Sequence, residues 1–471
     1  MRSKLQKFTQ FAQQLLPHEV TYLLKVQQLA DADRLAILQR IDYNCQHTDQ
    51  FTPYDTNIDK RKYHHLQNWM ERKLREIDVD EQFAWMSRLE HQIMMDTISS
   101  TEEKELLKAI KTYEYPCFFF VKFYELVQQY GQFLLVRIRY ADYQVVQHFL
   151  QTHRANYQLS QETNRKIHQA TEDIIAQYAG DARESSQWEQ WLKLTFYDLK
   201  MDGHNRYLAL VRLAFIAFNY RKLTLLQAAF DYMDEHFGYG QNYSKRLLLN
   251  YYNNRLMLHS RLREYEKAAY YGYLSIRAKN HDYLNYVNNL CAVLLRLDRN
   301  QEALDLMKQA AAAAKKTANF HSRVGYVSFY LEALNKNGLH QNAVSYGRSF
   351  LTAYHKEILQ YRWHLFFSVY FEALLHRRQF APILQITRKY RLLDKDQQYA
   401  AKANYLPSIP IYYWTAQYQE GLLAKQQLME QLSDLLGEQP SLTSDNRPLE
   451  ALLGTIRPIM PEVLVKWGMV A

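Results

Sequence analysis

The chain has 471 residues, a formal net charge of +9 at neutral pH and 48% hydrophobic residues. No uninterrupted apolar run of about 18 residues occurs in it, which excludes a membrane-spanning helix by the usual criterion. The three cysteines (Cys45, Cys117 and Cys291) are far apart and form no C-x-x-C pair, which argues against a disulfide framework and a cysteine zinc site.

The abundance of tyrosine and the scarcity of glycine and proline indicate helices. There are 38 tyrosines but only 13 glycines and 10 prolines, and no proline lies between residues 117 and 381. No segment there has the alternating pattern of a strand. We therefore predict an all-α protein. The first residues contain no apolar run of signal-peptide length, so we expect a cytoplasmic location without membrane association.

Residues 1–200 predict a helical N-terminal region whose class the sequence leaves open. Asp31 is placed to cap a helix through DRLAILQRI, and Thr101 to start another helix with acidic residues in its first turn. Residues 48–62 form the clearest internal loop. Residues 116–155 are so apolar and aromatic that we expect helices buried on more than one face.

Residues 201–436 are periodic. A short polar turn followed by a helix with a small residue near its start recurs at offsets of 40, 35, 40 and 40 residues. The aligned positions are Ala228, Ala268, Ala303, Ala343 and Ile383. Each is preceded by another apolar helix, so the pattern predicts helix pairs stacked as a solenoid. A small residue at this position lets the two helices approach each other closely.

These residues resemble the tetratricopeptide repeat family. The segments EYEKA and NQEAL are similar to the start of that family's second helix, and Leu290, Leu294, Ala303 and Ala310 match its packing positions. The resemblance covers about residues 205–395. It departs at Ile383, at Phe350 and in the 40-residue gaps. It implies an α-α superhelix of antiparallel helix pairs whose first helices line a concave groove.

The last segment, residues 437–471, contains four of the ten prolines. Its apolar end, MPEVLVKWGMVA, is expected to cover the exposed end of the solenoid as a capping tail, because terminal repeats need caps.

Asparagine recurs at equivalent positions of two adjacent first helices, in NYYNNRL (250–256) and NYVNNLC (285–291). Spacings of three and four residues place these side chains on one helical face. The resemblance implies a polar row along the groove, where amides can hold the backbone of an extended peptide. The row comprises Asn250, Asn253, Asn254, Asn285, Asn288, Asn289 and Ser328. Two alternatives are equally open: an asparagine ladder between helices, and a recent duplication.

A basic segment at residues 340–395 offers a different kind of site. Its cations include Arg377, Arg378, Arg388, Lys389 and Arg391, and aromatic residues lie among them. This mixture is compatible with nucleic acid, where phosphates meet cations and bases stack on rings, and with an acidic peptide. The structural alternative is a solvated helix face with aromatic residues in the core.

No catalytic, phosphate-binding or metal-binding motif occurs in the sequence. His148 and His153 are five residues apart and do not share a helix face, and GYGQNYSKR (238–246) lacks the phosphate-loop pattern. We therefore expect no enzyme activity, no cofactor and no metal.

The sequence favours a scaffold that binds a protein segment in the groove. Arg261, Arg296 and Lys336 lie further along the same first helices and are expected to meet acidic side chains of the partner. The alternative is a nucleic-acid-binding or sensing helical repeat that uses the basic segment. A third possibility is a regulatory module of a larger assembly whose N-terminal half packs on another subunit, which an exposed apolar patch there would favour.

Overall fold

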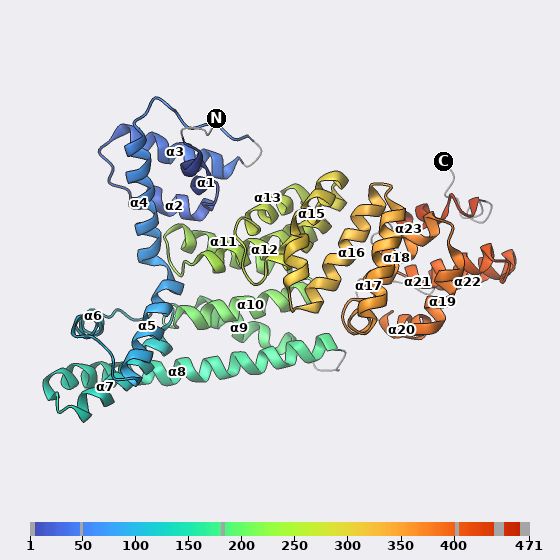
Figure 1. The fold of residues 1–471 in the computed structure, drawn as a ribbon. Coiled ribbons are helices and arrows are strands. Elements are labelled where there is room, and N and C mark those ends of the chain that lie inside the picture. Colours follow the sequence, from blue (N-terminus) through green and yellow to red (C-terminus); the bar gives the residue numbers. More distant parts are fainter. Residues whose placement is uncertain (1–4, 48–49, 180–183, 401–404, 438–446, 462–471) are drawn as a thin grey trace. The chain divides into compact units, whose positions relative to one another are not determined.

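The computed structural model of the chain describes residues 5–47, 50–179, 184–400, 405–437 and 447–461 (Figure 1). These residues form 23 α-helices and one short 3-10 helix, and no strand occurs among them. The all-α prediction is confirmed. The chain divides into two compact units, Met1–Glu264 (unit 1) and Tyr265–Ala471 (unit 2).

Unit 1 contains the first twelve α-helices. They are α1 (Gln6–Ala12), α2 (Pro17–Val26), α3 (Ala32–Gln46), α4 (Lys60–Ile77), α5 (Val79–Met94), α6 (Ser100–Lys111), α7 (Phe120–Val136), α8 (Tyr140–Ala179), α9 (Glu189–Tyr197), α10 (Gly203–Asn219), α11 (Leu223–Gly238) and α12 (Lys245–Arg261), with the 3-10 helix at Ser186–Trp188. The expected boundary at residue 200 lies between α9 and α10, which pack against each other within this unit.

The helix starts of unit 1 follow from local capping. Asp31 caps α3 as predicted, with its Oδ1 accepting from the Asp33 amide at 3.0 Å. The helix predicted from Thr101 begins at Ser100, because Ser99 and Glu102 form a capping box. The predicted loop at 48–62 ends earlier than expected, where Asp59 caps α4; residues 48 and 49 lie outside the described part of the chain.

Two aromatic-rich cores support unit 1. One joins α1 to α4, and the other joins α5 to α8 through rings such as Phe120, Phe123 and Phe149. Helix α7 buries eight residues, and their spacings of three and four residues place them on one side of the helix. The expectation that the helices of residues 116–155 are buried on more than one face is therefore wrong for α7, whose other side is half-buried or exposed.

Unit 2 contains the remaining α-helices. They are α13 (Tyr265–Ser275), α14 (Tyr283–Arg296), α15 (Asn300–Lys316), α16 (Phe320–Lys336), α17 (His340–Gln360), α18 (Trp363–His376), α19 (Phe380–Tyr390), α20 (Leu392–Tyr399), α21 (Ser408–Gln419), α22 (Lys425–Gly437) and α23 (Arg447–Ile456). Each of α14, α16 and α18 packs against the helix that follows it. The same three helices also pack side by side in the order α14, α16, α18, and α21 continues this row.

One turn conformation recurs between consecutive helices. The residue two positions before each second helix has a positive φ: Arg221, Arg263, Asp298, Gly338 and Arg378. The next residue donates its amide to the carbonyl five positions earlier, as in Arg299 N to Leu294 O at 3.0 Å. This hydrogen bond is the one that closes a helix in a Schellman motif. Four of the five turns use a residue other than glycine, so glycine positions alone do not mark them in the sequence.

The position predicted to hold a small residue is the fourth residue of the second helix. Ala268, Ala303, Ala343 and Ile383 stand there and are fully buried. The assignment of Ala228 is wrong, because this side chain is exposed. Helix α11 begins at Leu223, so its equivalent buried residue is Leu226.

The described part of the capping tail includes α23, which packs against α21. The apolar segment expected to cover the end of the solenoid falls mostly on residues 462–471, which lie outside the described residues.

Gly347 marks a close helix approach in unit 2, where α17 passes the ring of Tyr370 on α18. A Cβ at this position would lie 2.5 Å from Tyr370 Cδ2. We expect Gly347→Ala to lower the free energy of unfolding by about 1–3 kcal/mol, as overpacking of a core does. Gly454→Ala is the matched control, because its Cβ meets open space in α23. Urea unfolding measures the free energy of unfolding of both variants. An equal change for Gly347→Ala and Gly454→Ala would contradict the close approach of α17 and α18.

Candidate functional site

Three members of the predicted polar row are buried. Asn253, Asn288 and Ser328 are at most 4% exposed. The amide of Asn288 donates to Ser322 O on α16 at 3.0 Å, and Ser328 Oγ donates to Val324 O within its own helix at 2.9 Å. The expectation of exposed polar groups is therefore wrong for these three residues. Asn288 instead joins two neighbouring first helices, as the alternative of an inter-helix contact requires.

The other four asparagines are half-buried. In unit 1, Asn250 Oδ1 accepts from Tyr207 Oη at 3.0 Å and from Asn254 Nδ2 at 3.1 Å. In unit 2, Asn285 and Asn289 lie on α14 beside the buried Asn288. The cations predicted further along these helices, Arg261, Arg296 and Lys336, are all exposed. A role of these seven residues in binding stays a prediction.

The accessible side of α14, α16 and α18 forms one surface, here called the first-helix face. On α14 it comprises Asn285, Asn289, Ala292 and Arg296; on α16, Glu332 and Lys336; on α18, Ser368, Glu372 and His376. Spacings of three and four residues place each set on one side of its helix. Because the three helices pack side by side, equivalent positions form rows across them.

One of these rows is acidic. Glu332 and Glu372 occupy equivalent positions on α16 and α18. Burial, together with the negative charge of Glu332, raises the pKa of Glu372 to about 7, and Lys336 opposes this shift. Burial likewise raises the pKa of Glu332, against the charges of Lys336 and Arg296. Glu372 therefore changes its charge close to neutral pH.

Arg362 lies immediately before α18 and is half-buried. Its Nε donates to His321 Nε2 on α16 at 3.1 Å. No carboxylate of the described residues forms an ion pair with it. Burial lowers the pKa of Arg362, and burial together with the charge of Arg362 lowers the pKa of His321. The neutral imidazole can therefore accept this hydrogen bond.

Gly325 makes room for the Arg362 side chain. A Cβ at Gly325 would lie 3.3 Å from Arg362 Nη1 and 3.1 Å from Asn288 Nδ2. The guanidinium thus lies over α16 close to the buried Asn288, whose Oδ1 has no hydrogen-bond partner among the described residues. Three neighbouring helices position this one cation, which the sequence analysis did not single out.

The predicted nucleic-acid residues are all exposed, but they lie at opposite ends of α19. Arg377 and Arg378 form the turn before this helix, and Arg388, Lys389 and Arg391 lie at its end. Eleven residues of helix separate the two groups by roughly 16 Å. Cations in the last turn also stabilise a helix by interacting with the negative end of its dipole. Arg388 and Lys389 therefore have a structural role in α19.

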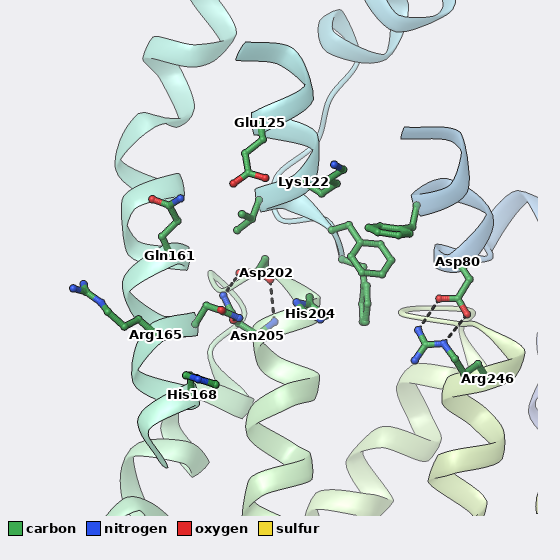
Figure 2. Close-up of a pocket in the computed structure, with 15 residues that line it drawn as sticks. Asp80, Lys122, Glu125, Gln161, Arg165, His168, Asp202, His204, Asn205 and Arg246 are labelled. Carbon is green, nitrogen blue, oxygen red and sulfur yellow. Dashed lines mark hydrogen bonds and ion pairs between the residues drawn. The ribbon is translucent and has the colours of Figure 1, made fainter. Parts of the chain in front are cut away.

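A cavity of about 880 Å³ lies within unit 1, where the first turns of α5, α7, α10 and α12 meet the long helix α8 (Figure 2). One wall is aromatic: the ring centroids of Phe83 and Phe119 are 4.9 Å apart, and those of Phe118 and Phe119 are 4.7 Å apart. The His204 ring lies 5.5 Å from Phe119. This wall offers flat apolar contacts.

The opposite wall of the cavity carries hydrogen-bonding groups. Asn164 Nδ2 donates to Asn205 Oδ1 at 3.0 Å, and Asn205 Nδ2 donates to Asp202 Oδ2 at 2.8 Å. Burial raises the pKa of Asp202, and the hydrogen bonds from Asn205 oppose this shift. Burial also lowers the pKa of His204.

The charges that line the cavity balance. Lys122, Arg165 and Arg246 are its lysine and arginine residues, and Asp80, Glu125 and Asp202 its acidic residues. Arg246 forms a two-point ion pair with Asp80, at 2.7 and 3.1 Å (Figure 2). The arrangement suits a ligand without net charge that has a flat apolar face and a polar edge.

Unit 1 also exposes an apolar tip at the ends of α5 and α7. Met94, Met95, Val136, Ile138 and Tyr140 are each 60–80% exposed. The ion pair between Arg137 Nη2 and Asp96 Oδ1 at 2.7 Å joins the two connections that carry them. The exposed patch that would favour the third possibility is therefore present in this half of the chain.

Sequence reasoning missed Arg362 and the cavity for a physical reason. Their residues come from segments far apart in the chain, as with Asp80 and Arg246, so no local spacing connects them. The aromatic density of PCFFFVKF was the one usable signal, because four of its residues line the cavity: Phe118, Phe119, Val121 and Lys122.

None of the described helices is long and apolar enough to cross a membrane. The part of the chain that the structure describes contains no group of three histidine, cysteine or acidic residues arranged to hold a metal ion. No protein-family model, curated protein or solved structure matches the chain.

Proposed function

We propose that the protein is a non-enzymatic scaffold that binds an acidic segment of a partner protein along the first-helix face of unit 2. The observation that supports it best is Arg362, a half-buried guanidinium that lacks an ion-pair partner among the described residues. A charge taken partly out of water without a partner is costly. A carboxylate from a partner would complete this site with two parallel hydrogen bonds.

The surroundings of Arg362 fit an extended protein segment. Asn285 and Asn289 on α14 can hold its backbone, since each amide both donates and accepts. Arg296 and Lys336 lie at the far end of the same helices and can meet further acidic side chains. In this proposal the helix pairs form a superhelix similar to tetratricopeptide repeats, and the first-helix face is its groove.

Replacing Arg362 tests the proposal. Proteins captured from a lysate of the source organism by the wild-type chain would identify the partner, and its acidic segment would then be titrated against Arg362→Gln. We expect affinity to fall about 10- to 100-fold, the loss of one or two charge-assisted hydrogen bonds. Arg388→Gln, an exposed arginine on α19, is the control and should bind normally. Equal affinity of wild type and Arg362→Gln would contradict the proposal.

The same experiment decides between this proposal and two others. Nucleic acid that is retained by Arg362→Gln and lost by Arg388→Gln would assign the function to the basic segment instead. The apolar tip supports a second candidate function, in which unit 1 docks on another subunit. A partner that is lost only by Ile138→Asp would assign the interaction to this tip.

A further inference from the structure

A narrow cleft of about 230 Å³ lies in unit 2 among α15, α16 and α17. It opens because α15 carries a run of five alanines, residues 310–314. Ala311 and Ala314 face the cleft from α15, while Tyr326, Tyr330 and Tyr346 face it from the other two helices. Small residues opposite large rings leave a hollow that the chain itself does not fill.

The walls of the cleft are ring surfaces. The rings of Tyr326 and Tyr330 are stacked with centroids 6.0 Å apart, and Tyr346 meets Tyr330 edge to face at 5.2 Å. Tyr326 is fixed by its hydroxyl, which donates to Met307 O at 2.8 Å. Tyr346 is 40% exposed and borders the opening. A planar group inside the cleft would contact these rings, which is the arrangement aromatic pairs favour.

The ionisable side chains that line the cleft, apart from the tyrosines, are Lys308, Lys315 and Arg323, and no acidic residue lines it. Lys308 Nζ is 3.6 Å from Asp305 Oδ1 in an exposed pair, which contributes little. The guanidinium of Arg323 lies 4.6 Å from the ring centroid of Tyr354, and its Nη2 donates to Tyr354 Oη at 3.2 Å. Three cations without a lining carboxylate favour an anion with more than one negative charge.

We propose that this cleft binds a phosphate monoester that also carries a planar ring, with the ring against the tyrosines and the phosphate between Lys308, Lys315 and Arg323. The volume corresponds to about eight water molecules, which is room for one ring and its phosphate but not for a helix. This chemistry has two sources, a nucleoside monophosphate and a phosphotyrosine side chain. The cleft uses residues outside the first-helix face, so the inference is independent of the proposed function.

The chain offers adjacent-residue controls for both parts of the site. Ala311→Leu fills the hollow, whereas Ala312→Leu adds the same side chain at an exposed position that does not line it. Lys315→Gln removes a lining cation, whereas Lys316→Gln removes an exposed cation outside the cleft. Leucine is a good helix former, so neither leucine variant is expected to disturb α15.

Isothermal titration of the full chain with phenyl phosphate tests the inference. We expect it to bind at least 10-fold more tightly than inorganic phosphate or phenol. Ala311→Leu and Lys315→Gln should each weaken binding at least fivefold, while Ala312→Leu and Lys316→Gln should not. Of adenosine monophosphate and O-phosphotyrosine, the tighter ligand identifies the source. Binding of phenyl phosphate no tighter than inorganic phosphate, or equal effects within either variant pair, would overturn the inference.

Discussion

Arg255→Met is expected to destabilise unit 1 by about 3 kcal/mol, the lower end for breaking a buried ion pair, because the guanidinium is buried whereas Asp231 and Asp234 are 60% and 33% exposed. Arg255 is 3% exposed, its Nη2 donates to Asp231 Oδ1 at 2.8 Å, and it also forms an ion pair with Asp234. His18 Nε2 on α2 lies 2.9 Å from Asp234 Oδ1. Burial alone would raise the pKa of Asp234, but His18 and Arg255 hold it below its usual value. The substitution therefore affects three helices at once.

The matched control for Arg255 is Arg246→Met. Arg246 also pairs with an aspartate, Asp80, but its side chain is 55% exposed. A surface pair contributes less than about 1 kcal/mol. Hydrogen exchange of the amides in α11 and α12 gives the free energy of opening for both variants. An effect of Arg255→Met as small as that of Arg246→Met would show that the buried network does not support unit 1.

Glu372→Gln is expected to change how the stability of unit 2 depends on pH. The folded pKa of Glu372 is about 7, against 4.5 for the free side chain. Between these values the folded chain keeps a proton that the unfolded chain releases, so this group makes stability fall as pH rises from 4.5 to 7. The loss is of the order of 3 kcal/mol at about 1.4 kcal/mol per pKa unit. Glutamine cannot ionise, so the variant should lack this loss.

Denaturant unfolding at pH 5 and pH 8 measures this difference. From pH 5 to pH 8 the wild-type chain should lose stability and Glu372→Gln should not. The difference in free energy of unfolding should therefore shift in favour of the variant, by up to about 3 kcal/mol. Glu420→Gln, which changes an exposed carboxyl at the end of α21, should follow wild type at both. A wild-type profile that matches the Glu372→Gln profile would contradict the raised pKa.

The periodic part of the fold was predictable because each helix pair repeats the same two local features in its sequence. A polar turn and a buried residue at the fourth position of the second helix recur often enough to locate α13, α15, α17 and α19. The error at Ala228 arose because the start of α11 and its buried fourth position were predicted from the same repeat spacing, whereas the helix begins at Leu223. The left-handed residues Arg221, Arg263, Asp298 and Arg378 were not predictable, since the turn hydrogen bond tolerates them and no glycine marks the site.

The candidate site was less predictable than the fold. Helical periodicity correctly placed Asn288 on a face of α14, but it does not show whether a neighbouring helix covers that face. Asn288 is fully buried because α16 packs over it, and Arg362 lies close to it because Gly325 leaves space. Both facts depend on side chains that meet across three helices, and a single sequence does not encode them as a local pattern.

Site-directed photo-cross-linking tests the central proposal most directly. A photoreactive phenylalanine analogue at Ala292, on the first-helix face, would be compared with one at Ser345, an exposed position of α17. We predict cross-links from Ala292 to an acidic segment of one partner protein, lost when Arg362→Gln is added, and none from Ser345. Cross-links that form equally at both positions, or that join Ala292 only to nucleic acid, would contradict the account.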